Sequence, residues 1–134
     1  MSLEFSAEVP TPEGLSNLSP SDRAARLSDI ARAVRRSVVR MIDSARAGHI
    51  GGDLSVTDIL TTLYFGVLKL DPASPLAPGR DRFILSKGHC AAALYSALAL
   101  RGFIAPALLP TFMKPLSVLN GHPNRRKVAG VEAN

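Results

Sequence analysis

Two helical segments of this sequence are apolar on nearly every side, and they constrain its fold more than any other feature. Residues 56–68 carry apolar side chains on three sides of the predicted helix, and residues 90–100 form a second apolar helix. A helix that is apolar around most of its circumference belongs in the core of a protein or in a membrane. Neither segment reaches the roughly 20 apolar residues needed to cross a bilayer. We therefore expect both helices inside a folded core, with no membrane contact.

An amphipathic helix is predicted ahead of these segments, over residues 19–47. Ser19 can cap its N-terminus, Pro20 suits the first helical position, and Asp22 favours the positive end of the helix dipole. The helix should end near Gly48, where glycine permits a left-handed turn. Its apolar side chains recur at steps of three and four residues and so share one face: Leu27, Ile30, Val34, Val38, Met41 and Ile42.

The segments on either side of the helices are expected to be irregular. Residues 1–20 are polar and proline-containing, and we expect them to form a flexible N-terminal tail. Residues 49–53 read as a loop, and Ser55 with Asp58 three residues later is a variant of the capping box that starts a helix. The second helix is therefore predicted to begin at Ser55.

The order of elements predicts the α/β class. Residues 82–86 are the one clear strand candidate, a short helix is expected over 106–113, and loops are expected from 116 onward. The order helix, helix, strand, helix favours a mainly parallel sheet flanked by helices, helix-rich in this portion. One strand cannot make a sheet, so the chain is expected to be incomplete as a folding unit.

Composition places the chain among soluble globular proteins. Hydrophobic residues make up 46% of it and charged residues 20%, as in folded proteins. Its 134 residues are enough for one domain with a core and too few for two. Its single cysteine, Cys90, excludes an internal disulfide, and residues 1–21 lack the apolar segment of a signal peptide. We therefore expect a cytoplasmic protein.

The net charge of +5 raises the question of nucleic-acid binding. Rows of basic residues more often form a solvated helix face or contact an acidic partner. The chain has no Trp and only two Tyr that could stack on bases. Nucleic-acid binding is therefore the weaker interpretation of the basic residues, which are Arg32, Arg36 and Arg40 at four-residue steps, Arg35 beside them, and residues 125–127.

Each of the three histidines lies in a loop beside glycine. His49 lies in Gly-His-Ile-Gly-Gly, His89 in Ser-Lys-Gly-His, and His122 in Gly-His-Pro. Glycine lets the backbone approach a ligand closely, and imidazole can donate, accept or transfer a proton near neutral pH. One such histidine is usually a turn residue bonded to the backbone. Three in the same setting indicate a binding or catalytic site.

The loop at Gly88 and His89 has the physical character of a phosphate site. A strand, a glycine turn and a helix bring free backbone N–H groups to the positive end of a helix dipole, which favours diphosphate. His89 can add a further donor. Cys90 follows directly, and a cysteine at the start of a helix can be a reactive thiol. Because residues 91–94 are apolar, we interpret Cys90 instead as a small core residue.

Four motifs, in this order, closely resemble the N-terminal region of transketolases. They are Ala-Gly-His-Ile-Gly-Gly at 47–52, Arg-Asp-Arg-Phe-Ile-Leu-Ser-Lys-Gly-His at 80–89, Gly-His-Pro at 121–123, and Gly-Val-Glu-Ala at 130–133. The resemblance runs from about residue 31 to the last residue. It is strongest to the split type, in which separate N- and C-terminal subunits make the enzyme. It implies that residues 21–134 are the N-terminal portion of a thiamine-diphosphate-binding domain.

The resemblance implies an enzyme component that transfers a two-carbon ketol unit between sugar phosphates or related substrates. His49 is then expected to line the substrate channel near the reacting carbon. His122 is expected to hold the hydroxyl and carbonyl end of the donor sugar, so both count as catalytic residues. His89, with Gly88, is expected to contact the diphosphate of the cofactor, thiamine diphosphate. Proton donors beside the reacting centre suit ketol transfer.

The resemblance also implies that other parts of the site lie outside this chain. The family's Thr-Gly-x-Leu-Gly-x-Gly segment and its Gly-Asp-Gly motif with a downstream Asn, which supplies ligands for Mg2+ or Ca2+, are absent from the sequence. Gly51-Gly52-Asp53 has the wrong order to replace that motif. The family's cofactor-activating glutamate lies in the C-terminal half. We therefore expect no metal site here, and a hetero-oligomer built on a dimer with a further chain.

Two other interpretations stay open at this point. One is a non-catalytic assembly subunit derived from the transketolase fold, although such a scaffold would have no chemical need for three histidines. The other is a basic nucleic-acid-binding module, which rests on charge alone. The sequence leaves open the identity of the sugars, the stoichiometry of the assembly and whether the end at Asn134 is natural.

Overall fold

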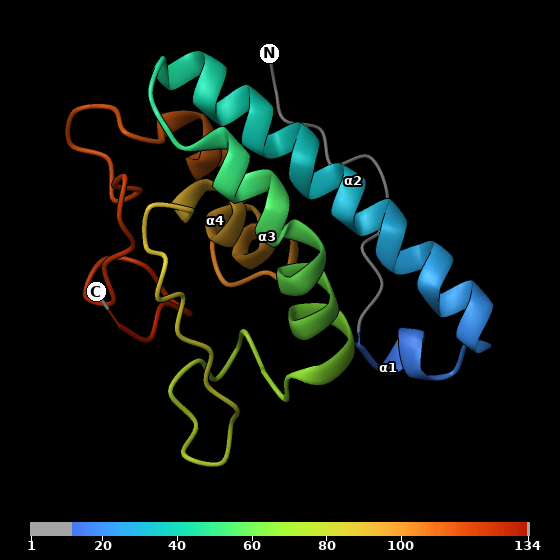
Figure 1. The fold of residues 1–134 in the computed structure, drawn as a ribbon. Coiled ribbons are helices and arrows are strands. Elements are labelled where there is room, and N and C mark those ends of the chain that lie inside the picture. Colours follow the sequence, from blue (N-terminus) through green and yellow to red (C-terminus); the bar gives the residue numbers. More distant parts are fainter. Residues whose placement is uncertain (1–11, 134) are drawn as a thin grey trace.

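The amphipathic helix is the longest element of the computed structural model, which describes residues 12–133. This helix, α2, spans Pro20–Ala45 and runs diagonally across Figure 1. The side chain of Ser19 accepts a hydrogen bond from the backbone N–H of Asp22 at 3.2 Å, which confirms the predicted cap. The apolar face predicted for the helix is its buried face: of its six predicted residues, Leu27 and Ile42 are partly buried and the other four are at most 5% exposed, namely Ile30, Val34, Val38 and Met41.

The second helix, α3, begins earlier than predicted. It spans Ile50–Thr62, so most of the loop expected at residues 49–53 is its first turn. Ser55 lies inside the helix, where its hydroxyl donates to the C=O of Gly52 at 3.2 Å. The prediction that Ser55 starts the helix is therefore wrong.

The early start of α3 follows from the turn that precedes it. Arg46 and Gly48 have positive φ angles of 53° and 143°, so the chain reverses within three residues of the end of α2. The backbone N–H of Asp53 then donates to the C=O of His49 at 3.1 Å, which is the first helical hydrogen bond of α3. A side-chain cap is not needed to place this helix, since the reversal already fixes its start.

The helix α3 is buried on one face only. It continues into a π-helical turn, η1 (Leu63–Val67), so helical structure reaches the end of the predicted segment. Ile59 and Val67 are 58% and 61% exposed, which corrects the expectation that this helix is buried nearly all round. Its buried residues are Asp53, Val56, Thr57, Leu60 and Thr61 in α3, and Tyr64 and Phe65 in η1.

The helix predicted at residues 90–100 forms as α4 (Ala91–Leu100) and lies at the centre of the fold. All of its residues except Leu100 are buried, and α2, α3 and the later helix η2 pack against it (Figure 1). Its many alanines let these neighbours approach closely. Ser96 stays satisfied inside this core, because its hydroxyl bonds to the C=O of Ala92 at 2.8 Å and to Ser37 of α2 at 3.0 Å.

The chain after α4 covers the remaining side of that helix. A 3-10 helix, η2 (Pro106–Thr111), matches the short helix predicted over 106–113, and loops follow it through the rest of the described residues, as predicted. The rings of Tyr95 and Phe112 pack edge to face with centroids 6.1 Å apart. Six buried residues come from this part of the chain: Leu109, Phe112, Leu119, Pro123, Val128 and Val131.

No strand is present among residues 12–133, so the predicted α/β sheet is not seen there. Residues 82–86, the strand candidate, have no regular secondary structure. A strand needs a neighbour whose backbone groups complete its hydrogen bonds, and the described chain supplies none. The side of α4 that the sheet was expected to cover is covered by loops instead.

Of residues 1–20, which were predicted as a flexible tail, residues 1–11 lie outside the described part of the chain. Residues 12–16 form a short helix, α1 (Pro12–Ser16), in which Leu15 is 1% exposed. Arg23 of α2 donates to the C=O of Leu15 at 3.1 Å and to that of Ser16 at 2.9 Å. This part of the segment therefore packs against α2. Within the part of the chain that the structure describes, no helix is long and apolar enough to cross a membrane.

A buried ion pair joins the segment before residue 82 to the C-terminal loop. The two guanidinium nitrogens of Arg80 face the two carboxylate oxygens of Glu132, one pair at 3.0 Å. The side chains are only 7% and 11% exposed, and both line a cavity of about 370 Å3. Breaking one partner of such a pair leaves a charge without water or counter-ion.

We predict that Glu132→Gln lowers the free energy of unfolding by about 3 kcal/mol, because Arg80 keeps its charge in a buried place. The control is Asp29→Asn, which removes the exposed pair between Asp29 and Arg32 and should cost less than about 1 kcal/mol. Urea denaturation of both variants measures the difference. Equal losses for the two variants would contradict the structural importance of the buried pair.

Candidate functional site

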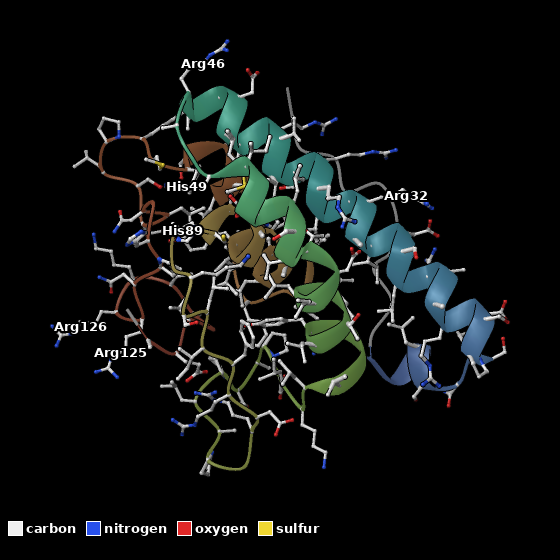
Figure 2. All side chains as sticks on the ribbon, viewed as in Figure 1. Arg32, Arg46, His49, His89, Arg125 and Arg126 are labelled. Carbon is white, nitrogen blue, oxygen red and sulfur yellow. The ribbon has the colours of Figure 1, made fainter. Side chains whose placement is uncertain are left out.

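Two of the three histidines lie against each other. The ring centroids of His49 and His89 are 5.0 Å apart, and the ring planes meet at 67° in an edge-to-face contact. His49 occupies the cap position of α3, and His89 lies just before Cys90, the cap position of α4. Both histidines are exposed, and Figure 2 shows them close together on one side of the molecule. The starts of α3 and α4 therefore bring two predicted site residues to one place.

His122 reaches the same region from a third loop. A Cβ atom placed on Gly88 would lie 3.9 Å from Cγ of His122, so the loops that carry His89 and His122 touch. The His122 loop is fixed to α4, because the hydroxyl of Tyr95 donates to the C=O of Asn120 at 2.9 Å. His122 is exposed as well. The three histidine loops thus meet, with the His89 loop in contact with the other two.

The helix α3 begins so close to α4 that position 52 must be glycine. A Cβ atom on Gly52 would lie 2.6 Å from Sγ of Cys90 and 3.6 Å from Nε2 of His89. Cys90 is fully buried, so its sulfur has little room to move. The neighbouring Gly51 has no atom within 4 Å of its Cβ position. Packing therefore requires only one of the two adjacent glycines.

Asp53 forms a second link between the two helix starts. Its side chain is 1% exposed and accepts a hydrogen bond from the backbone N–H of Ala93 in the first turn of α4 at 2.8 Å. A carboxylate at this place also faces the positive end of the α4 dipole. The arrangement is that of a helix cap supplied by another helix.

This link corrects the physical argument for a phosphate site at the start of α4. The N–H of Ala93 is taken by Asp53, and the N–H of Cys90 donates to the C=O of Lys87 at 2.9 Å. Residues 91–93 are buried. The expectation of free backbone N–H groups there is therefore wrong for these two amides, whereas the imidazole of His89 is exposed.

The ionisation of Asp53 reflects its surroundings. Burial raises the pKa of this carboxyl above its ordinary value, and the hydrogen bond from Ala93 opposes that shift. The nearby groups of His49, His89 and Lys87 also lower it, because positive charge favours the carboxylate. Desolvation outweighs these contributions, so the ionised form of Asp53 is less favourable in the folded protein than in water.

Asp53 and Lys87 are the residues of this region that sequence reasoning missed. Lys87 donates through Nζ to the C=O of Gly52 at 3.3 Å and to Oγ of Ser55 at 3.2 Å. Asp53 had a signal, because it stands three and seven residues before buried Val56 and Leu60, on the core face of an apolar helix. Lys87 had none, since its partners, Gly52 and Ser55, lie more than 30 residues earlier in the sequence.

Cys90 is a core residue, as interpreted from the sequence. It is buried, and burial raises the pKa of its thiol, which disfavours the reactive thiolate. Among residues 12–133, no three His, Cys, Asp or Glu side chains gather in a way that could hold a metal ion. The expectation that metal ligands lie outside this chain stays a prediction.

The basic residues of α2 are partly paired. Arg35 forms a two-pronged contact with Asp58 of α3, at 2.5 and 3.1 Å, and Arg32 pairs with Asp29. Figure 2 shows Arg32 on α2 and Arg125 on the other side of the view, near the C-terminal loops. The basic groups therefore form separate patches. The hypothesis of nucleic-acid binding still rests on the net charge alone.

Comparison with known proteins identifies the family. Residues 27–134 match the domain family described as transketolase, thiamine diphosphate binding domain. This chain belongs to the transketolase family. The match covers all three histidine loops, so the exposed region where they meet lies within the transketolase domain.

The similar proteins include chains that are named as subunits of transketolases. One is a subunit of the apulose-4-phosphate transketolase of Phocaeicola vulgatus, 45% identical over 100 residues, covering 75% of this chain and 35% of the relative. Another is the 6-deoxy-6-sulfo-D-fructose transketolase subunit SqwG of Clostridium sp., 39% identical over 112 residues, covering 84% and 41%. The human transketolase is 38% identical over 97 residues, covering 72% and 16%. The chain thus spans well under half of the length of these transketolases.

We predict that Gly52→Ala destabilises this transketolase domain by about 1–3 kcal/mol, because its methyl group would collide with the sulfur of Cys90. The control is Gly51→Ala, which meets no neighbour and should be neutral or gain up to about 1 kcal/mol of helix propensity. Thermal or urea denaturation measures both. Adding Cys90→Ala to Gly52→Ala should recover much of the loss, and a loss unchanged by that second substitution would refute the collision.

We predict a pH-dependent stability difference between the wild type and Asp53→Asn. Because the folded-state pKa of Asp53 is raised, the folded protein binds this proton more readily than the unfolded chain, whose value is about 3.9. The wild type should therefore lose stability relative to Asp53→Asn as pH rises from about 4 through the raised pKa, and the difference should then level off. Urea titrations between acid and neutral pH measure it. A difference of opposite slope would show that Asp53 is stabilised as the anion.

Proposed function

We propose that this chain is one component of a thiamine-diphosphate-dependent transketolase, which transfers a two-carbon ketol unit between sugar phosphates or related substrates. The observation that carries the proposal is the meeting of His49, His89 and His122, from three separate loops, in one exposed region. Imidazoles that are exposed and close together can exchange protons with a common ligand near neutral pH. A chain that served assembly alone would have no chemical use for them.

His89 and Gly88 are proposed to bind the diphosphate of the cofactor. The residues present suit this group, because an exposed imidazole can donate to a phosphate oxygen and Gly88 presents backbone without a side chain. The contribution of α4 is indirect, since two of its first amides are already bonded within the protein. When bound, thiamine diphosphate supplies the nucleophilic carbon on which ketol transfer depends.

His49 and His122 are proposed to act on the substrate. His122 would hold the hydroxyl and carbonyl end of the donor sugar, and His49 would exchange a proton with a hydroxyl near the reacting carbon. Both belong to loops that contact the His89 loop, so a ligand held by His89 would lie within reach of both. Their exposure leaves room for a sugar to approach.

The rest of the site is proposed to come from a further chain, in a cytoplasmic hetero-oligomer built on a dimer. The names of the relatives support this arrangement, since several are called subunits of a transketolase, which implies a second kind of chain. The further chain would supply the ligands of Mg2+ or Ca2+ and the glutamate that activates the cofactor. This chain would contribute the histidines and the wall of the site around them.

Reconstitution tests this proposal. The chain alone should bind thiamine diphosphate weakly in calorimetry, because no set of side chains among residues 12–133 could hold a metal ion against the diphosphate. Mixed with a chain that carries the metal motif, it should bind tightly in the presence of magnesium and transfer a ketol unit from a ketose phosphate to an aldose phosphate. Tight magnesium-dependent binding by the chain alone would contradict the divided site. A complex that binds the cofactor but transfers from no sugar would favour a role in assembly alone.

Within the active complex, the histidines should divide their labour. His89→Ala should raise the cofactor concentration needed for half activity, with turnover largely recovered at saturation. His122→Ala should leave cofactor affinity nearly unchanged and lower turnover by about 10²–10³, the usual loss for a donor to developing charge. His49→Ala should resemble His122→Ala in a milder form, because water can replace a proton relay. Cofactor titrations of activity distinguish the roles, and an exchange of the effects of His89→Ala and His122→Ala would overturn them.

A further inference from the structure

We infer that Asp53 is a positioning residue for the histidine site: its buried carboxylate ties the first turn of α3 to the first turn of α4 and thereby holds the rings of His49 and His89 together. The side chain acts through these neighbours, because it is 1% exposed and out of reach of a ligand on the surface. Its effect on catalysis rests on the proposed function. Its effect on the two rings does not.

The geometry gives Asp53 a bond to each of the two turns. Its backbone N–H donates to the C=O of His49 at 3.1 Å and so closes the first turn of α3. Its carboxylate accepts the N–H of Ala93 at 2.8 Å, and Ala93 lies one helical turn after His89 in the sequence. A single residue thus connects two turns that each begin beside a histidine. If the bond to Ala93 is lost, the separation of the two rings is no longer fixed at this end.

The other contacts between the two turns are weaker constraints on the rings. Lys87 bonds to the C=O of Gly52 and to Ser55, but at 3.3 and 3.2 Å and through a long side chain with many rotamers. The contact of Gly52 with Cys90 sets how closely the turns approach, but it has no direction. The bond from Asp53 is short, buried and directional, and water cannot replace it there.

The cost of Asp53 supports a role beyond stability. Burial raises the pKa of its carboxyl, so the ionised form is less favourable in the folded protein than in water. A buried ionisable group breaks the usual rules of a folded core, and such departures are expected mainly at functional or strained sites. The groups that face this carboxylate are His49, His89 and Lys87, all able to carry positive charge, so its charge attracts side chains of the two turns that its hydrogen bonds join.

The test is solution NMR of the full chain carrying substitutions at position 53. Asp53→Leu replaces the carboxylate by a larger apolar side chain without an acceptor, Asp53→Ala removes the group, and Asp53→Asn keeps one oxygen acceptor. The matched control is Asp58→Asn, in the same helix, whose side chain is 68% exposed and pairs with Arg35. The wild type, Asp58→Asn and Asp53→Asn should show cross-peaks between the rings of His49 and His89. Asp53→Leu and Asp53→Ala should lose them, and the amide of Ala93 should exchange with solvent about tenfold faster or more.

The outcomes separate this inference from the proposed function. Ring cross-peaks that persist in a folded Asp53→Leu or Asp53→Ala variant would overturn it, as would their loss in Asp53→Asn while the Ala93 amide stays protected. In the reconstituted complex, Asp53→Leu should raise the cofactor concentration for half activity and lower turnover, each about tenfold, with most of the loss recovered by Asp53→Asn. A wild-type complex without transfer activity would count against the proposed function and leave the NMR result standing.

Discussion

Position 52 admits no side chain, because a Cβ atom there would lie 2.6 Å from the buried sulfur of Cys90. That contact limits how closely the starts of α3 and α4 can approach, and the hydrogen bond that the carboxylate of Asp53 accepts from the N–H of Ala93 holds them together. The exposed histidines at the starts of these two helices depend on these two constraints. His49 caps one helix, and His89 directly precedes the cap of the other, so the separation of the helices becomes the separation of the imidazoles.

The contact between the starts of α3 and α4 also limits which groups could neutralise the charge of a diphosphate bound there. A helix start with free amides could neutralise part of that charge by itself. Here the amide of Ala93 is bonded to Asp53, which also adds a negative charge beneath the surface. An anion near His89 therefore gains from the imidazole and little from the helix. The metal ion that we propose on a further chain would supply positive charge that this helix start does not.

Sequence reasoning found the parts of this structure whose signal is local. The face of α2, the position of α4 and the three histidine loops follow from periodicity and from glycine beside histidine. The start of α3 was missed because Arg46 in a left-handed conformation reverses the chain earlier than any capping residue indicated. The predicted sheet is absent from residues 12–133. It was predicted wrongly for this part of the chain because a strand forms only beside a partner strand, and the sequence of residues 82–86 does not show whether one is present. Asp53 was missed because its partner, Ala93, is distant in the sequence.

The cover of α4 links the core to the site in a way that neither would show alone. The loops after η2 bury Leu119 and Val128 over the central helix, and the same stretch carries His122 on its outer surface. Tyr95 connects the two sides, with its ring against Phe112 in the core and its hydroxyl on the C=O of Asn120. A buried hydroxyl that lost this acceptor would be desolvated without compensation, so the loop is held where the core needs it. The place of His122 beside the His89 loop is thus a consequence of burying α4, and the packing of the core and the geometry of the site are one constraint on this sequence.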